Sequence, residues 1–396
     1  MTLVIRSVRV VTPHASSPRV SARNGLDVRI DAGRIAEVGP DLEIPETAEV
    51  LEGRGRVLVP GFVDAHTHAC WAGSRLDEWE RKLEGVSYQE QMAEGGGIMA
   101  TVRAVREASE EELSDALLVR LDWMLSEGTT TVEVKSGYGL SLEAELKMLR
   151  AIRGAGERWP GRVIPTACLG HALDPEVPDF VTTVIEEQLP AVSEAFPGIA
   201  VDAYCEEGAW SVTDCVRLFE AASKLGHPIR MHADQFNSLG IIPEAIRLGA
   251  RSVDHLEATT RPNLEALARS SVIGVMLPVS GFHLDDRYAD GRGFIDAGGT
   301  LVVATNFNPG SAPSPSIPFA LSLAVRKLGL TPHEALTAVT ANAAALLGLE
   351  DAGEIRVGAR ADLVLLRHRD ERELARTVGG NPVAAVLCDG RVQLSG

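Results

Sequence analysis

Two histidines separated by one residue follow an apolar run near the start of the chain. His66 and His68 come shortly after residues 57–63, a valine-rich run that predicts a buried strand. Residues two apart in a strand point to the same side, so both imidazoles can bind one metal ion. A His-x-His pair alone is weak evidence, and its weight depends on further ligands at the ends of other strands.

The chain from residue 57 to residue 305 alternates strand-like apolar runs with helical segments. This pattern is typical of βα units, and eight units predict an α/β fold, the (β/α)8 barrel of the TIM type. The predicted strands are the run ending at His66 and His68 and residues 129–135, 163–169, 199–205, 228–232, 251–255, 272–277 and 300–305. Functional groups in such barrels lie at the carboxyl ends of the strands.

Polar side chains gather at these predicted strand ends. Five of the ten histidines lie there, namely His66, His68, His171, His232 and His255. Core histidines would not concentrate in this way, so we predict a shared metal site on this rim. The same rim carries Lys135, Tyr138, Glu206, Glu207 and Asn306. The remaining histidines outside strand ends, which are His14, His227, His333 and His368, are expected to face solvent, and His283 stays unassigned.

The His-x-His strand end resembles the first barrel strand of the metal-dependent amidohydrolase superfamily. Three imidazoles, from His66, His68 and His232, suit zinc or iron and leave positions for water. Binuclear members carry a bridging carboxylated lysine on the fourth strand, whereas Lys135 lies on the second. Glu206 on the fourth strand is a less favoured bridge. We therefore predict one divalent or trivalent ion per subunit, zinc or iron.

His255 follows the sixth predicted strand. We interpret it as the catalytic group that orients or deprotonates the water, with Asp254 and Glu257 fixing its tautomer. The alternative is a structural histidine bonded to a backbone carbonyl.

Seven longer stretches resemble the imidazolonepropionase family of this superfamily, which acts in histidine degradation. They are Ala72-Gly73-Ser74-Arg75, Gly95-Gly96-Gly97-Ile98, Val134-Lys135-Ser136-Gly137-Tyr138-Gly139-Leu140, Leu169-Gly170-His171-Ala172, His232-Ala233-Asp234-Gln235, Val253-Asp254-His255-Leu256 and Asn308-Pro309-Gly310-Ser311. Their order and spacing match from about residue 57 to residue 350. KSGYGL and NPGS are far more specific signals than His-x-His.

The resemblance implies hydrolysis of the cyclic amide of 4-imidazolone-5-propanoate to N-formimino-L-glutamate. It implies His66, His68 and His232 as metal ligands. The implied substrate-binding residues are Arg75, Tyr138, His171, Gln235, Asn308, Gly310 and Ser311, with Gln235 touching the ring that opens. Arg75 offers a planar fork for the substrate carboxylate, and an ordinary surface arginine is the alternative.

Two positions depart from the family pattern. Gln235 stands where members carry Glu or Gln, and a neutral amide can still donate to a ring carbonyl. Asn306 stands where an Asp usually binds the metal and shuttles a proton. An amide can offer its oxygen to the metal but cannot take a proton near neutral pH. Three interpretations stay open: a variant that uses His255 as base, a substitution made to trap substrate, or an altered or lost activity.

Two other functions are compatible with these residues. One is another hydrolase of the superfamily, such as a heterocycle deaminase or a binuclear dihydropyrimidinase-like enzyme, although Arg75 and Lys135 argue against these. The other is a non-catalytic ligand-binding protein, which only Asn306 favours.

Both ends of the chain read as short strands joined by turns. We predict that residues 1–58 and 353–396 form one small β-sandwich beside a barrel domain of residues 59–352. Two separate β flaps are the alternative.

The bulk composition limits the partners. A formal charge of −17 argues against nucleic acid and anionic membranes and means that an anionic substrate needs a local cation. Five scattered cysteines without a CxxC pair fit a reducing cytoplasm. We see no signal-peptide core and no apolar stretch near ~18 residues. The resemblance implies a homodimer.

Overall fold

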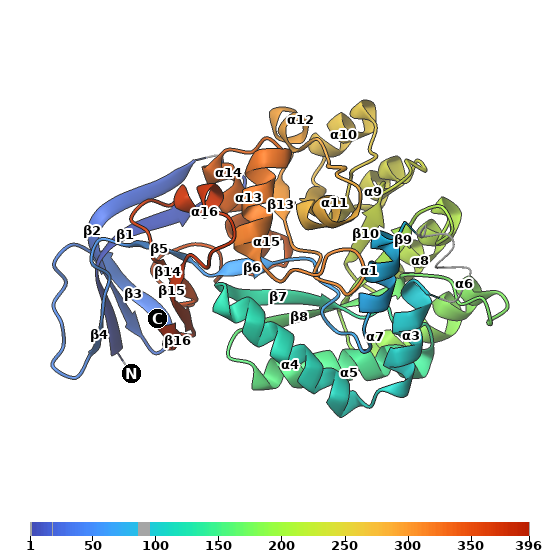
Figure 1. Ribbon diagram of the computed structural model, residues 1–396, viewed down its shortest axis with the longest axis horizontal. Helices are drawn as coiled ribbons and strands as arrows, with labels where there is room; N and C mark the ends of the chain where they lie inside the picture. The colour runs from blue at the N-terminus through green and yellow to red at the C-terminus, as the bar shows by residue number, and fades with distance from the viewer. Residues whose placement is uncertain (1, 18, 86–95, 396) are drawn as a thin grey trace.

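The computed structural model describes residues 2–17, 19–85 and 96–395, and the Gly95 of the Gly95–Ile98 stretch lies outside them. Its strands form two eight-stranded sheets. Figure 1 shows the larger sheet with its surrounding helices beside the smaller one, which carries both ends of the chain. No helix among the described residues is long and apolar enough to cross a membrane.

The larger sheet contains eight parallel strands that pair in chain order. They are β6 (Phe62–Asp64), β7 (Thr129–Lys135), β8 (Arg162–Gly170), β9 (Ala200–Cys205), β10 (Ile229–Ala233), β11 (Ser252–His255), β12 (Ile273–Met276) and β13 (Leu301–Val303). All eight predicted strands are present, and seven of them have ends that differ by two residues at most. The first predicted run is divided, because residues 57–60 belong to the smaller sheet and only β6 lies in the barrel. Most of their residues are buried, because helices cover the outside of a parallel barrel and the lumen fills with side chains.

The barrel closes just beyond the ends of β6 and β13. The amide of Asn306 donates to the carbonyl of His66, and the amide of His68 donates to the carbonyl of Phe307, each at 3.0 Å. Thr67 and Phe307 form a parallel bridge at the same place. The seam between the first and last strands therefore passes through two predicted metal ligands and Asn306.

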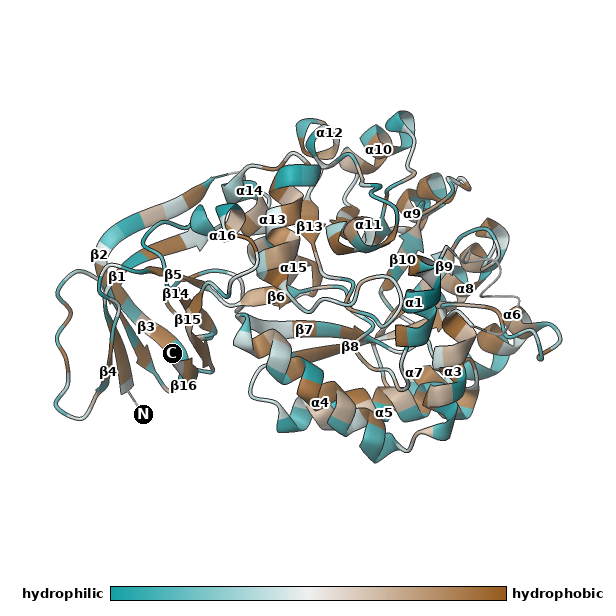
Figure 2. Ribbon diagram, viewed as in Figure 1, coloured by the Kyte–Doolittle hydropathy of each residue, from teal (hydrophilic) through white to brown (hydrophobic). Residues whose placement is uncertain are grey.

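Helices follow the barrel strands and cover them, and the last helix of the chain follows a strand of the smaller sheet. They are α1 (Leu76–Leu83), α3 (Ile98–Glu107), α4 (Glu110–Ser126), α5 (Leu142–Arg158), α6 (Phe180–Thr183), the π-helix η1 (Val184–Gln188), α7 (Leu189–Ala195), α8 (Val212–Lys224), α9 (Ile242–Leu248), α10 (Arg261–Ala268), α11 (Pro278–Leu284), α12 (Gly291–Asp296), α13 (Ile317–Lys327), α14 (Pro332–Ala338), α15 (Ala341–Leu346) and α16 (Glu373–Arg376). Local sequence sets their starts: Ser109 and Glu112 form a capping box at α4. Figure 2 shows brown, apolar segments on β8, and mixed colouring on β7, α4 and α5.

The smaller sheet combines both ends of the chain. Its strands are β1 (Thr2–Pro13), β2 (Val20–Asp31), β3 (Arg34–Gly39), β4 (Glu49–Glu52), β5 (Val57–Pro60), β14 (Leu363–Leu366), β15 (Val383–Cys388) and β16 (Arg391–Ser395). β5 pairs with β1 on one side and with β14 on the other, so the two-flap alternative is wrong.

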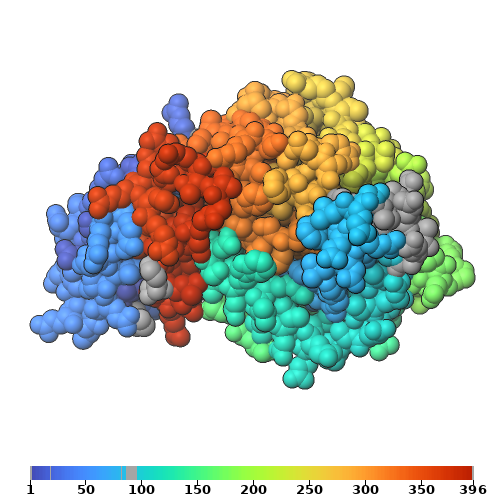
Figure 3. Space-filling model, in the orientation of Figure 1, coloured from blue at the N-terminus to red at the C-terminus, as the bar shows by residue number. Residues whose placement is uncertain are grey.

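The small sheet encloses its own apolar core. Ile30 of β2, Leu58 of β5 and Leu365 of β14 belong to one buried cluster, as expected for the predicted β-sandwich. Figure 3 shows the C-terminal residues, in red, between the N-terminal strands, in blue, and the barrel.

Candidate active site

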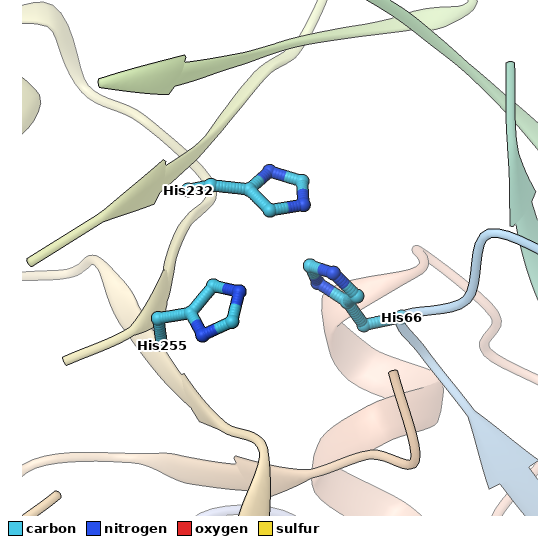
Figure 4. Close-up of side chains that lie close together, drawn as sticks. All are labelled: His66, His232 and His255. Atoms are coloured by element: carbon cyan, nitrogen blue, oxygen red, sulfur yellow. The ribbon is translucent and has the colours of Figure 1, made fainter. Parts of the chain in front are cut away.

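Four histidine rings converge at the carboxyl ends of the barrel strands. His66, His232 and His255 each offer a nitrogen within 4.8 Å of the others, and Figure 4 shows these rings facing one another. His68 joins them, with its Nε2 3.0 Å from Nε2 of His232. All four side chains are buried. The structure thus brings together the three histidines that the sequence suggested as metal ligands and adds His255 beside them.

Carboxylates hold the far nitrogens of two of these rings. Nδ1 of His66 donates to Asp254 at 2.6 Å, and Nδ1 of His232 donates to Asp202 at 3.0 Å. Each ring then presents Nε2 to the centre, which is the usual arrangement of metal-binding imidazoles. Among the described residues, Nε2 of His66 has no partner.

Of the two residues predicted to fix the tautomer of His255, only one contacts it. Asp254 accepts from His66 and not from His255, because its side chain points into the barrel lumen one layer below the rim. Glu257 alone is placed to fix the His255 tautomer, at 3.2 Å from Nδ1.

Burial disfavours the charged form of several rim imidazoles. Desolvation lowers the pKa of His66 and His68 well below the usual value of histidine, and it lowers the pKa of His171 to about 3. A neutral imidazole is the form that binds a metal. Neutral, buried nitrogens that face one another, one of them without a hydrogen-bond partner, fit a metal ion.

A network of buried charges lies beneath these rings. Nζ of Lys135 donates to Glu133 and to Asp202, each at 2.8 Å. Nη2 of Arg230 donates to Asp254 at 2.7 Å, while its Nη1 lies 3.3 Å from Glu133. None of these side chains is more than 2% exposed.

The charged network connects the two imidazoles at its ends. It runs from His66 through Asp254, Arg230, Glu133, Lys135 and Asp202 to His232. None of these connections was predicted from the sequence. A signal was present, because charged residues at alternate positions of an apolar strand, such as Glu133 and Lys135, must face the lumen together.

Lys135 and Glu206 are both engaged elsewhere. Lys135 lies on β7, the second barrel strand, between the two carboxylates that it pairs with. The Glu206 carboxylate accepts hydrogen bonds from the amides of Glu207, Phe236 and Asn237 and from the Asn237 side chain. Glu206 thus ties the loop after β10 to the end of β9.

Asn306 follows β13 with its amide oxygen free. Its Nδ2 donates to Oγ of Ser280 at 2.8 Å, and its buried Oδ1 has no partner among the described residues. Its φ of 56° and the φ of 91° at His255 lie in the left-handed region, which costs a non-glycine residue energy. Such backbone strain is typical of functional rims.

Three aromatic rings form a group on one side of the site. The His171 ring stacks on that of His68, with centroids 4.6 Å apart, and the Tyr138 ring lies 5.0 Å from that of His171. Nδ1 of His171 donates to the carbonyl of Gly137 at 3.0 Å. Two predicted substrate residues therefore lie directly beside a predicted metal ligand.

Arg75 is not an ordinary surface arginine. Its side chain is only 13% exposed, and Nη2 donates to Glu78 at 2.5 Å. Nη1 contacts Thr101 at 3.4 Å, while the buried Nε has no partner among the described residues. The guanidinium thus pairs with Glu78, and its Nε–H stays available to a ligand.

The loop of residues 308–311 packs against Arg75. A Cβ added at Gly310 would lie 3.5 Å from Nη1 of Arg75. The Asn308 side chain shapes this loop, since its Oδ1 accepts from the amides of Gly310 and Ser311 and its Nδ2 donates to Oγ of Ser311.

Gln235 is held by a tyrosine that the sequence analysis missed. The hydroxyl of Tyr204, on β9, donates to Oε1 of Gln235 at 2.9 Å. Gln235 lines a small cavity together with Glu257 and Ser280, which are the partners of His255 and Asn306.

The expectation that His227 faces solvent is wrong. Its side chain is buried between α8 and the start of β10, where Nδ1 bonds the carbonyl of Ile199 and Nε2 bonds Oγ of Ser193, each at 2.8 Å. Polar flanks alone could not reveal two partners that lie 28 and 34 residues away.

Comparison with known proteins agrees with this geometry. The profile of the amidohydrolase family matches residues 57–393. An imidazolonepropionase of Rubrobacter xylanophilus is 43% identical over 98% of each chain. Another, of Herpetosiphon aurantiacus, is 44% identical over 92% of this chain and 89% of its own. The chain belongs to the imidazolonepropionase family.

Membership of this family confirms the resemblance carried by the sequence stretches. A solved triazine hydrolase variant shares only 19% identity but covers 100% of this chain and 95% of its own, with a TM-score of 0.80. That likeness shows the fold alone, and it confirms the barrel with an accessory β-sandwich.

Proposed function

We propose that this protein hydrolyses the cyclic amide of 4-imidazolone-5-propanoate to N-formimino-L-glutamate in histidine degradation. The observation that carries this proposal is the nearly full-length similarity to imidazolonepropionases. The convergence of buried imidazoles beside a shielded arginine supports it. Water adds across the ring C–N bond, and the ring nitrogen leaves with a proton.

The proposed cofactor is one zinc or iron ion held by His66, His68 and His232, with Oδ1 of Asn306 as a fourth donor. When bound, such an ion activates a water molecule for attack at neutral pH. Nε2 of His66 and Oδ1 of Asn306, which have no partner in the described part of the chain, support this donor set.

The chain's own groups orient the substrate and move the proton. Glu257 holds Nδ1 of His255, which leaves Nε2 to accept or relay the proton of the attacking water. Arg75 binds the substrate carboxylate, and Tyr138 and His171 hold the ring in place.

Residues of two loops complete the proposed pocket. Gln235, oriented by Tyr204, donates to the ring carbonyl. Asn308, Gly310 and Ser311 line the side next to Arg75.

His66→Ala and His232→Ala test the site and the function together. Each variant should lose most of its metal and all turnover of imidazolone propionate, while its circular dichroism spectrum stays native because the apolar core does not include these rim side chains. His333→Ala, on α14 away from the rim, is the control that should keep both. If the double variant with both substitutions still bound one equivalent of metal, the ligand assignment would be mistaken.

Asn306 favours one second candidate, a ligand-binding protein without catalysis. Calorimetry and product analysis of the metal-loaded protein test this candidate. Binding of imidazolone propionate without any release of N-formimino-L-glutamate would support it.

We also propose a homodimer located in the cytoplasm. Leu76, Trp79 and Leu83 lie exposed on one face of α1, which supports association of two copies, and light scattering would measure the mass. The five cysteines are all buried and free, as a reducing compartment would keep them. In each copy, residues 59–352 would form the catalytic domain and residues 1–58 with 353–396 the accessory one.

A further inference from the structure

A second cavity lies at the opposite end of the barrel from the histidines. Its volume is about 550 Å³, and residues at or near the amino ends of β8, β9, β10 and β11 line it together with the end of α15. Catalytic groups of this fold gather at the other face, so the cavity is separate from the proposed active site.

The charge of this cavity is opposite to that of the whole chain. The chain carries 55 acidic and 38 basic residues, yet Arg153, Arg230 and Arg251 line the cavity and none of its lining residues is acidic. Within the described part of the chain, neither Arg153 nor Arg251 has a carboxylate within 4 Å. Arg153 lies over the ring of Phe196 at 5.0 Å, and Arg251 reaches only the carbonyl of Leu346, at 3.5 Å.

Arg230 forms the inner end of the cationic lining. Its side chain is only 2% exposed, and its Nη1 lies 3.3 Å from the Glu133 carboxylate, so Arg153 and Arg251 supply the unpaired charge of the cavity. The same side chain donates to Asp254, which accepts from His66. A ligand in this cavity would therefore lie three contacts from the proposed metal site.

Apart from the arginines and Thr166, the lining residues have apolar side chains or are glycines. Ile164, Phe196 and Leu347 lie among the lining residues, and the volume far exceeds that of an inorganic anion. Pockets of a few hundred Å³ with apolar walls and a few placed polar groups are typical of small organic ligands. We propose that this cavity is a second binding site, which takes a small organic carboxylate with an apolar body.

Calorimetry with 3-phenylpropionate tests this proposal. The host is the full chain with Arg75→Ala, because the proposed catalytic anchor could otherwise bind the same probe. We expect binding in this host, and at least about tenfold weaker binding when Arg153→Ala and Arg251→Ala are added, since charge-assisted hydrogen bonds are lost. Arg153 and Arg251 are exposed, so the fold should survive, and thermal melting checks this. Inorganic phosphate should bind much more weakly, because it cannot use the apolar walls.

Three outcomes would overturn the proposal. The first is no binding of 3-phenylpropionate to the Arg75→Ala protein. The second is equal binding with and without Arg153 and Arg251, which would place the ligand elsewhere. The third is phosphate binding as tightly as 3-phenylpropionate, which would show a site for inorganic anions.

Discussion

The amide at position 306 limits which side chain can accept the proton of the attacking water. An Asp there would add a charge beside the histidines and could act as a base, whereas Asn306 can only offer its oxygen. No described residue bonds that oxygen, and the amide nitrogen donates to Ser280, so the side chain is held in one orientation. His255, fixed by Glu257, is then the remaining candidate base.

Substitutions at these two positions separate the interpretations of Asn306. If Asn306 is adapted, His255→Ala should lower kcat by ~10²-fold or more, the usual scale of a positioned base, and Asn306→Asp should change kcat only slightly. Steady-state turnover with measured metal content checks both. A rise of ~10²-fold in Asn306→Asp, with His255→Ala still active, would show that a needed base is missing.

Arg75 illustrates what burial adds to a sequence motif. The sequence left open whether it was a surface residue, and the structure places it against Glu78 and the loop of residues 308–311. A substrate carboxylate must therefore share this guanidinium with Glu78.

Arg75→Ala should mainly raise KM, by a factor that corresponds to a loss of about 1.5–3 kcal/mol of binding free energy. Arg75→Lys should recover only part of this loss, because an ammonium lacks the planar fork. Glu78→Gln is the matched control and should not raise KM, since it removes a competitor for Arg75. Initial-rate kinetics measure all three. An unchanged KM in both arginine variants would move the carboxylate site to His171 or Tyr138.

At the level of elements, the outward and inward residues of the barrel strands differ in what the sequence predicts from them. Their apolar, β-branched outward residues made all eight strands predictable, because a buried parallel strand reads as a short apolar run. Their inward residues do not reveal their partners: His66 and Asp254 meet across 188 residues of chain, and no local pattern encodes that pairing. The rim histidines were predictable because strand ends share one face, and their hydrogen bonds were not.

Removing a buried cation from β7 should lower the free energy of unfolding more than removing an exposed cation. Lys135→Met removes the cation that Glu133 and Asp202 share in the lumen and should lower the free energy of unfolding by about 3–5 kcal/mol. Lys327→Met breaks an exposed pair with Asp286 at the same 2.8 Å and should change the free energy of unfolding very little. Urea unfolding measures both, and equal losses would contradict the role given to burial.

Across the whole molecule, one carboxylate joins the two sheets. Asp351 accepts from Arg34 of β3 at 2.8 Å and from Arg162 of β8 at 2.9 Å. The hydrogen bond from Arg162, followed by that from Arg34, lowers the pKa of Asp351 from its ordinary value to about 2.

This pKa predicts an acid-sensitive part of the stability. A lowered pKa means that the contribution is complete above about pH 4 and is lost as the pH falls towards 2. Native protein should exceed Asp351→Asn in free energy of unfolding by about 1–2 kcal/mol at pH 5, after allowing for partial exposure. The difference should shrink below pH 4 in urea titrations. A difference that stays constant down to pH 2.5 would exclude this linkage.

The place of β5 between β1 and β14 also sets an order in time. Pro60 pairs with Leu363, so about 300 residues must be synthesised before the open edge of β5 meets its partner. At the usual speed of ribosomes this takes roughly 15–60 s. An unpaired strand edge can pair with other chains during that interval. The small sheet is thus begun first and completed last, and the barrel must assemble beside an unfinished neighbour.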